Sequence, residues 1–451
     1  MKTYKIAIIG GGPAGIIAAI AASQNLNNIN NNNHHHHHED IILIEKNNSL
    51  GKKLLLTGNG RCNIANSKSI REQLNLLKHK NFLKHSFYSF SNEDLIAIFK
   101  DKGLDFKEEK DGRYFPITDD ANSILAILKD YLNNLNIKIL LDSPVKSISK
   151  EGIKEKEEKK GDRDKEKEKE KNKEKDLFLI DTDSISLKAE KVIIATGGNS
   201  YPQTGSTGDG YDIAKSFDHE ITPIKPGLIS LSVKNSYFKH LSGISLENLN
   251  ISFKEHSIKG DLLFTHFGLS GPGILDISNF IVESDYKSDY NSNNLSEKIV
   301  ISLDLIPNST KEELSKRIIA DSQSNGKTMV KNYLKHYLKN RFIDYFLNIA
   351  QISGNKTLSN LSKKDRNKII AKLKDFQVEI ANTAPRETAM ITCGGISTKK
   401  INSKTMESKL IQNLYFAGEL LEPYGPTGGY NLQIAFSTGF LAGKSSTESF
   451  N

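Results

Sequence analysis

The chain has 451 residues, 37% of them hydrophobic, which suits two or three domains with cores of their own. Its only cysteines, Cys62 and Cys393, exclude a disulfide framework and a cysteine-based zinc site, and they favour a reducing, cytoplasmic compartment. The net charge of +8 permits an anionic partner such as nucleic acid, but no compact Lys/Arg cluster with interleaved aromatic residues requires one.

The N-terminal part alternates apolar strand patterns with helical ones. A low-complexity stretch, 25–38, interrupts it with asparagines and five consecutive histidines. A metal site there is conceivable, but a histidine run without spaced partners favours a solvated loop. Ser91 and Asp94 have the spacing of a capping box. The expected elements are strands over 4–9 and 41–45 and helices over 14–24, 92–102 and 121–132.

A second low-complexity stretch, 150–176, contains 12 Lys/Arg and 11 Asp/Glu and therefore adds little net charge. It has no apolar face, so we expect an excursion at the tip of a hairpin. The elements expected around and after it are strands over 145–148, 177–180 and 192–195 and a helix over 209–217.

The remaining sequence predicts an inserted domain and a return to the first one. Alternating hydrophobicity over 221–304 indicates strands, and the pattern over 311–376 is helical. A strand over 414–417 and a helix over 430–441 close the chain. The expected class is α/β, with domain parts at 1–217 and 381–451 around an insert at 218–380 (β-rich 218–305, helical 306–380).

Gly10, Gly12 and Gly15 form a G-x-G-x-x-G motif between the first strand and the first helix. In this context the glycines allow a tight turn, close approach of a pyrophosphate, and close helix–strand packing. Glu45 ends the next strand, where an acid accepts ribose hydroxyls. Its unusual distance from Gly15 is explained by the Asn/His stretch. The pattern predicts a dinucleotide-binding Rossmann-type domain.

The C-terminal segment favours FAD over a nicotinamide as the bound dinucleotide. The strand over 414–417 ends in Gly418 and Glu419 and is followed by a glycine-rich loop and a helix. A second approach to the same cofactor, hundreds of residues later, suits a long ligand. The acid can accept ribityl hydroxyls, and the helix N-terminus can stabilise negative charge on the reduced flavin.

On several blocks the sequence resembles the HI0933-like flavoproteins, also called BaiN/RdsA-type NAD(P)/FAD-dependent oxidoreductases. One departure is Asn59, where the family pattern usually has glycine, so the local backbone is in question. The matching blocks, in chain order, are 8–15, 51–63, 112–116, 195–210, 262–272 and 415–431.

The resemblance implies a two-dinucleotide-binding-domain fold with an inserted β-rich plus helical domain. It also implies FAD, NAD(P)H as a transient electron donor, and reduction of a carbon–carbon double bond. The substrates associated with the family are steroid-like bile-acid intermediates and a uridine of large-subunit ribosomal RNA, so the expected partner is a small molecule or RNA. No second nucleotide motif, membrane segment or oligomeric state is indicated by the residues.

The residues expected to hold FAD lie in the glycine-rich loops and at the strand ends that follow from the motif and the resemblance. They are Gly10, Gly12, Pro13, Ala14, Gly15, Glu45, Lys46, Lys53, Thr57, Gly58, Gly60, Arg61, Asn63, Val145, Thr196, Gly197, Gly198, Gly418, Glu419, Gly428, Gly429, Tyr430, Asn431 and Leu432.

Three residues are candidates for catalysis, each with a plainer alternative. Arg61 can stabilise an anionic reduced flavin or orient a carbonyl, or else pair with a pyrophosphate or a structural carboxylate. Cys62 can donate a proton, although a buried packing residue is the commoner role. His266 can act as a general acid, or it can hydrogen-bond to backbone in its loop.

Three functions remain open from the sequence. The first is an FAD-dependent, NAD(P)H-linked reductase of a conjugated C=C bond, with ribosomal uridine as one substrate. The second is a flavin oxidase of a small amine, which would reoxidise quickly in air. The third is a non-catalytic RNA-binding or assembly protein stabilised by FAD. No metal is expected.

Overall fold

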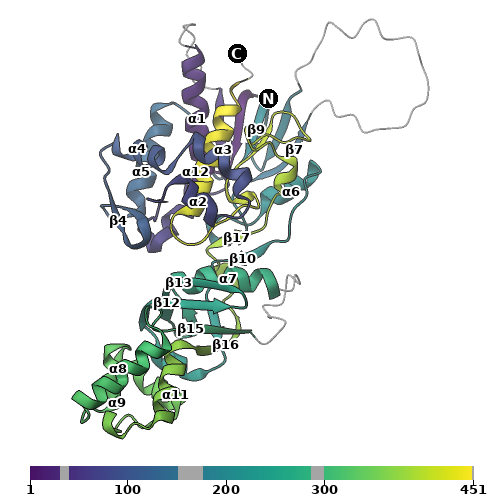
Figure 1. Cartoon of the computed structure of the whole chain (residues 1–451). Helices are drawn as coiled ribbons and strands as arrows, with labels where there is room; N and C mark the ends of the chain where they lie inside the picture. The colour runs from purple at the N-terminus through teal and green to yellow at the C-terminus, as the bar shows by residue number, and fades with distance from the viewer. Residues whose placement is uncertain (31–39, 151–175, 286–298, 449–451) are drawn as a thin grey trace, which may run out of the picture. The chain divides into compact units, whose positions relative to one another are not determined.

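The computed structural model describes residues 1–30, 40–150, 176–285 and 299–448. The histidine run, and all but the ends of the Lys/Glu stretch, lie outside these residues. The chain forms two compact units, unit 1 (Met1–Ile224 with Ile391–Asn451) and unit 2 (Lys225–Met390) (Figure 1). The expected insert at 218–380 therefore begins and ends too early, since 218–224 belong to unit 1 and 381–390 to unit 2.

Unit 1 is built on a sheet whose central strands are parallel. The β18 strand (Leu414–Phe416), from the C-terminal part of the chain, pairs in parallel with β9. The expected hairpin around the Lys/Glu stretch is present, because β7 and β8 pair antiparallel. The strand order is β6 (Lys138–Leu140), β2 (Ile41–Ile44), β1 (Thr3–Ile9), β9 (Ser186–Ile194), β8 (Phe178–Thr182) and β7 (Val145–Lys150).

Four parallel strands of this sheet end level with one another. Ile9 of β1 pairs with Ile44 of β2 and with Ile194 of β9, and Ile194 pairs with Phe416 of β18. The segments that follow these residues therefore meet at one edge of the sheet, where open α/β sheets bind ligands.

The two ends of the chain pack together through α1 (Pro13–Asn30) and α12 (Tyr430–Ser445). A Cβ on Gly439 of α12 would lie 2.3 Å from the carbonyl oxygen of Ala14, and one on Gly443 would lie 2.2 Å from that of Ala18. These glycines let the two backbones touch. The α1 helix extends beyond the expected 24, because the first asparagines of the low-complexity stretch continue it to Asn30.

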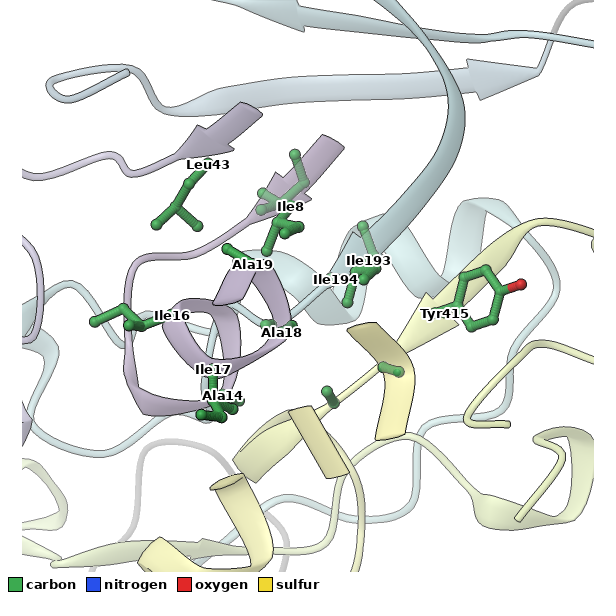
Figure 2. Close-up of a cluster of buried hydrophobic side chains, with 14 of the residues drawn as sticks. Ile8, Ala14, Ile16, Ile17, Ala18, Ala19, Leu43, Ile193, Ile194 and Tyr415 are labelled. Carbon is green, nitrogen blue, oxygen red and sulfur yellow. The ribbon is translucent and has the colours of Figure 1, made fainter. Parts of the chain in front are cut away.

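One hydrophobic core joins these elements. Ile8 of β1, Ile16 of α1, Ile193 of β9 and Tyr415 of β18 lie in the same buried cluster (Figure 2). Burial of such side chains contributes roughly 1.5–3 kcal/mol each. The core therefore requires both the N-terminal and the C-terminal parts of the chain.

The rest of unit 1 covers this framework. The predicted capping box of Ser91 and Asp94 is present at the start of α4. Two helices and a three-stranded sheet were not predicted, namely α2, α3 and the sheet β3–β5–β4. The elements are α2 (Ile70–Leu76), α3 (Lys80–Ser89), α4 (Asn92–Lys100), α5 (Ala121–Asn134), α6 (Asp209–Ser216), β3 (Ala65–Asn66), β4 (Phe106–Glu109), β5 (Arg113–Pro116) and β17 (Ile391–Cys393).

Unit 2 contains a closed barrel and a helical part, which lies in the sequence before the last barrel strand. Its first strand, β10 (Lys225–Gly227), lies outside the barrel. The strand order around the barrel is β11 (Leu231–Val233), β14 (Gly268–Ser270), β13 (His256–Phe264), β12 (Ser245–Phe253), β15 (Ile299–Asp304) and β16 (Phe376–Thr383).

Two details of this unit differ from the expected β-rich and helical parts. The region predicted to be β-rich contains the helix α7 (Pro272–Asp285), which packs on β13 where Gly260 and Gly273 bring the backbones into contact. The region predicted to be helical to 380 ends in β16, which alternates buried and exposed residues as a barrel strand does. The helices between are α8 (Lys311–Ser324), α9 (Val330–Tyr333), α10 (Asn340–Ala350) and α11 (Lys363–Lys374).

Unit 2 has its own hydrophobic core, in which barrel residues such as Phe264 and Phe376 contact Phe342 of α10. Within the described residues, no helix is both long and apolar enough to cross a lipid bilayer.

Candidate cofactor site

In the glycine-rich turn after β1, Gly10 and Gly15 lie against neighbouring backbone, whereas the space beside Gly12 is empty. A Cβ on Gly10 would lie 2.4 Å from the carbonyl oxygen of Ala195, and one on Gly15 would lie 1.8 Å from that of Gly10. A Cβ on Gly12 would meet nothing within 4 Å. This difference matches the roles of the three glycines in a dinucleotide turn. Pro13 and Ala14 begin α1 directly behind the turn.

Glu45 lies directly after β2 and is only 8% exposed. One carboxylate oxygen accepts the backbone N–H of Gly11 at 2.7 Å. The other accepts the backbone and side-chain N–H groups of Asn47 at 2.8 and 2.6 Å. These bonds fix the acid beside the glycine turn, the position that a ribose-binding acid requires.

Lys46 connects this strand end to the loop that follows β9. Its Nζ donates to Asp209 at 2.6 Å and to the hydroxyl of Thr207. Burial opposes ionisation of Asp209, but the hydrogen bonds from Lys46 and Thr207 hold the pKa of that carboxyl below its usual range. Asp209 therefore stays ionised near neutral pH and accepts the hydrogen bond from Lys46.

A second ion pair links the 51–63 block to the C-terminal strand. Lys53 Nζ donates to Glu419 Oε2 and to the Ser200 hydroxyl, both at 2.6 Å. Glu419 Oε1 accepts the Ser200 hydroxyl at 3.1 Å and the N–H of Thr392 at 2.8 Å. Gly198 must lack a side chain because its Cβ would lie 2.3 Å from the Thr392 hydroxyl.

The loop after β9 begins with Thr196 and Gly197. The Thr196 hydroxyl is buried against Gly210, where a Cβ would lie 2.2 Å from it, and has no hydrogen-bond partner among the described residues. Gly197 has a positive φ of 78°. In the loop after β18, Gly418 (φ 80°) would place a Cβ 2.8 Å from that of Ala14, so this loop touches the start of α1.

The loop over 57–63 has an unusual backbone. Gly58, Asn59, Gly60 and Cys62 all have positive φ values, of 58°, 56°, 84° and 61°. The loop is held by the Cys62 N–H, which donates to the Thr57 carbonyl at 2.9 Å. Asparagine tolerates this region better than other non-glycine residues, which explains how Asn59 can replace the family's glycine.

Cys62 is fully buried in the core of unit 1. Burial raises the pKa of its thiol to about 12, against a weaker opposing hydrogen bond with Thr57. The thiol is therefore protonated at neutral pH and closed off from solvent. This geometry favours the packing role over the proton-donor role.

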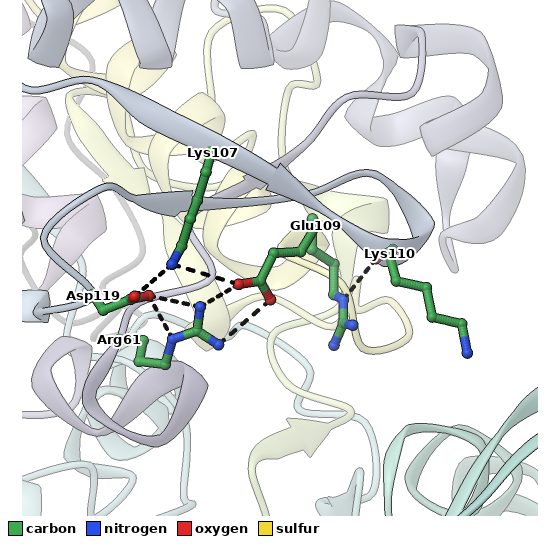
Figure 3. A network of polar contacts seen from close by, with 6 residues as sticks. Arg61, Lys107, Glu109, Lys110 and Asp119 are labelled. Carbon is green, nitrogen blue, oxygen red and sulfur yellow. Dashed lines mark hydrogen bonds and ion pairs between the residues drawn. The ribbon is translucent and has the colours of Figure 1, made fainter.

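Arg61 lies between two carboxylates (Figure 3). Its guanidinium pairs with Glu109 and, at 2.6 Å, with Asp119, and it lies 4.1 Å from the centroid of Phe115. The hydrogen bond with Glu109 raises the pKa of Arg61. Lys107 also pairs with Asp119. The structural carboxylates weighed as an alternative partner for Arg61 are therefore present, which favours a role in holding the 57–63 loop.

Asn63 joins that loop to the C-terminal glycines. Its side-chain amide lies between the Ala65 carbonyl and the Gly429 N–H and, oriented to suit both, bonds each at 3.2 Å. Asn431 closes the neighbouring loop by exchanging hydrogen bonds with Gly425, both at 2.9 Å.

Four of the remaining predicted residues lie around these loops. Gly428 has a φ of 125°. The Tyr430 side chain is buried in a cluster with leucines and Phe87, and its ring lies against Gly428, where a Cβ would be 2.8 Å from it. Leu432 is half-buried against the main core, and Val145 begins the edge strand β7.

His266 belongs to unit 2, on a turn between β13 and β14. The turn is closed by the Thr265 N–H, which donates to Gly268 O at 2.8 Å. The exposed imidazole contacts the Phe267 ring edge-on, with 5.0 Å between the centroids, and no described residue forms a hydrogen bond with it. The alternative role as a backbone-bonding histidine is therefore not seen.

Five residues that were not predicted from the sequence complete the contacts of Glu45, Lys46 and Glu419, namely Asn47, Ser200, Thr207, Asp209 and Thr392. The motif Thr-Gly-Asp-Gly at 207–210 contained part of the signal, since polar residues between glycines are typical of ligand-binding loops. Thr392 offered no such signal.

The site suits a dinucleotide. The turn offers open backbone at Gly12 and the N-terminus of α1 for a pyrophosphate. Two carboxylates, Glu45 and Glu419, are suited to accept hydroxyl groups from a ribose and a ribityl chain. Lys46 and Lys53 each pair with a carboxylate, of Asp209 and Glu419, and so hold the loops of the site together.

Comparison with known proteins agrees with this geometry. The family model for the HI0933-like protein Rossmann domain matches residues 4–445. The chain is 30% identical to the ribosomal RNA dihydrouridine synthase of Haemophilus influenzae over 87% of this chain and 88% of that protein. It is 27% identical to the 3-dehydro-bile acid delta(4,6)-reductase of Clostridium scindens over 98% and 99%.

Among solved structures, the 3-ketosteroid delta1-dehydrogenase of Sterolibacterium denitrificans shares the fold, with a TM-score of 0.51, 12% identity and full coverage of both chains. With the family model matched over nearly the whole length and the sheet edge built as a dinucleotide site, the chain belongs to the HI0933-like family of FAD-dependent oxidoreductases.

Proposed function

We propose that this protein reduces the C5=C6 double bond of a uridine in large-subunit ribosomal RNA, with NAD(P)H as the electron donor. The observation that carries the proposal is the 30% identity, over 87% of the chain, to a protein named for dihydrouridine synthesis in ribosomal RNA. A second relative bearing this name, from Escherichia coli, is 28% identical over 86% of the chain.

In this proposal the loops at the edge of the unit 1 sheet hold FAD. The Gly12 backbone and the α1 N-terminus receive the pyrophosphate, and Glu45 accepts hydroxyls of the adenosine ribose. Glu419, oriented by Lys53, accepts hydroxyls of the ribityl chain. The bound flavin supplies hydride-transfer chemistry.

The chain must then supply a proton to the substrate carbon that does not receive hydride. His266 is the candidate donor, because its imidazole is exposed and has no hydrogen-bond partner among the described residues. Cys62 is excluded from this role in the described conformation by its burial. Arg61 acts through the 57–63 loop, which it holds to Glu109 and Asp119.

The test combines flavin reduction with product analysis. Anaerobic NADPH or NADH should bleach the spectrum of the purified holoprotein. The reduced protein, incubated with large-subunit ribosomal RNA lacking dihydrouridine, should add two hydrogens to one uridine, as detected by mass spectrometry. Bleaching without product would overturn the RNA substrate, and a spectrum that does not bleach would overturn the nicotinamide donor. Rapid reoxidation by air with peroxide would favour an oxidase.

His266→Asn tests the proton donor. We expect the variant to bleach with the nicotinamide as the wild type does, because the imidazole plays no part in that half-reaction. Dihydrouridine formation should fall about 10²-fold, the usual contribution of a general acid. An unchanged rate of product formation would assign the proton to solvent or to another group.

A further inference from the structure

The helical part of unit 2 carries a large excess of positive charge. Residues 311–375 contain 15 Lys/Arg and 6 Asp/Glu, a net charge of +9 against +8 for the whole chain. These cations form no compact cluster in the sequence, because they are spread over α8 to α11 and the segments between these helices. The fold brings them together, since α8 and α11 pack against each other.

A groove of about 460 Å³ runs between these two helices. The residues that line it are Lys311, Glu312, Ser315 and Lys316 of α8 and Asn367, Ile370 and Ala371 of α11. The groove therefore offers two ammonium groups against one carboxylate, together with hydroxyl and amide groups, and such donors bind phosphate and sugar oxygens.

The α11 helix extends this basic surface beyond the groove. Lys364, Lys368 and Lys372 are spaced four residues apart and share one helical face beside Asn367 and Ala371. Each is exposed or half-exposed, and none forms an ion pair with a described residue.

The acids of this region leave most cations without a carboxylate partner. Asp365 pairs with Lys356, and Asp344 pairs with Lys331. Asp321 accepts the Tyr333 hydroxyl at 2.8 Å instead. Within the described residues, the cations without an ion pair are Lys311, Lys316, Arg317, Lys327, Lys335, Lys339, Arg341, Lys363, Lys364, Arg366, Lys368 and Lys372. Such an excess attracts a polyanion and repels other cations.

We propose that this groove and the Lys364–Lys368–Lys372 row bind the phosphate backbone of the RNA substrate, an inference that rests on the proposed function. A lipid surface would need apolar side chains facing outward. The apolar residues Ile369 and Leu373 of α11 are instead buried in the unit 2 core. Contacts with phosphates position the RNA without reading its sequence, so residues at the reaction site must select the uridine.

The test uses the full-length holoprotein and large-subunit ribosomal RNA transcribed in vitro, without dihydrouridine. For Lys364→Glu/Lys368→Glu/Lys372→Glu, we expect at least tenfold weaker RNA binding at about 0.1 M salt. We also expect the slope of log affinity against log salt to fall by roughly two to three, because each lost phosphate contact removes about 0.7–0.9. The neutral variant Lys364→Gln/Lys368→Gln/Lys372→Gln should lose less affinity, but its slope of log affinity against log salt should fall by a similar amount.

The matched control is Lys80→Glu/Lys84→Glu/Lys100→Glu, which makes the same charge change on exposed positions of unit 1 helices. It should keep affinity within about threefold, and all variants should keep the melting temperature of the wild type. Equal losses in the control and the α11 variant would reduce the effect to net charge and overturn the proposal. If the α11 variant lost the wild type's binding to phosphatidylserine vesicles but still bound RNA normally, the surface would be a lipid-binding one and the proposal would be overturned.

Dihydrouridine formation separates this proposal from the proposed function. If the wild type modifies the RNA and the α11 variant binds it normally, only the binding surface is wrong. If the wild type binds the RNA through α11 but adds no hydrogen to it, the surface stands and the proposed reaction fails.

Discussion

Gly12 and Gly15 lie three residues apart in the same turn, and alanine at each should have a different effect. Gly12→Ala adds a methyl group to open space without positive φ, so the fold should be unchanged while the pyrophosphate is hindered. We expect the apoprotein melting temperature to stay within about 1 °C and FAD affinity to fall at least tenfold. Calorimetry of the apoprotein and flavin fluorescence titration measure the two effects.

Gly15→Ala is the comparison. Its Cβ would lie 1.8 Å from the Gly10 carbonyl oxygen, so the turn must open and stability should fall by about 1–3 kcal/mol or more. Normal FAD binding by Gly12→Ala would show that the pyrophosphate does not approach this turn.

At the residue scale, the roles that the sequence could not decide are those of residues whose partners lie far away along the chain. The glycine motif and Glu45 were identified by spacing, because their contacts depend on local geometry. The sequence left the role of Arg61 open, because its partners Glu109 and Asp119 lie 48 and 58 positions away. The sequence favoured a buried Cys62 only because free cysteines are usually buried, and the hydrophobic core of unit 1 shows that it is.

At the scale of elements, the contact between α1 and α12 decides whether replacing a glycine of α12 raises or lowers the free energy of unfolding. In an exposed helix, Gly→Ala stabilises by about 1 kcal/mol. For Gly439→Ala the new Cβ would lie 2.3 Å from the Ala14 carbonyl oxygen, so the helices must separate. We expect a net loss of about 1–3 kcal/mol in the free energy of unfolding, measured by denaturant titration. A gain in stability would mean that the helices can move apart freely.

The ion-pair network around Arg61 should add a pH-dependent part to stability. The Arg61 hydrogen bond lowers the pKa of Glu109, and hydrogen bonds from Lys107 and Arg61 lower that of Asp119. A lowered carboxyl pKa stabilises the fold above the unfolded value of about 4, and this contribution is lost as pH falls through the lowered folded value.

The variant Glu109→Gln/Asp119→Asn should therefore melt below the wild type at pH 7, and the difference should shrink below about pH 4. Both carboxylates are partly exposed, so the effect should also weaken in high salt. Thermal melts at several pH values measure it. A difference that is constant across pH would assign the loss to packing.

The elements whose hydrophobic period was clear were predicted well, including β1, β2 and the Ser91–Asp94 capping box of α4. The errors occurred where packing overrides the local pattern. The α7 helix packs on β13 in a region of alternating residues, and β16 begins at Phe376, inside the part that was expected to be helical to 380.

At the scale of the whole molecule, the two units have separate hydrophobic cores, and the proposed FAD residues lie in unit 1. FAD should therefore raise the melting temperature of one transition. At a concentration 100 times its dissociation constant, it should stabilise unit 1 by about 2.7 kcal/mol. Calorimetry with and without FAD, with hydrogen exchange to locate each transition, measures this. Equal shifts of both transitions would show that the units unfold together.

The sequence by itself determined the α/β class, the dinucleotide turn, the acid at Glu45 and the return of the chain in a second glycine-rich loop. These features depend on residues close in sequence, where spacing and backbone geometry are enough. Only the tertiary structure decided the partners of Arg61, the burial of Cys62 and the basic surface of α8 and α11. Those features depend on which distant segments meet. Strand pairing and burial in the cores determine this, and spacing along the chain does not.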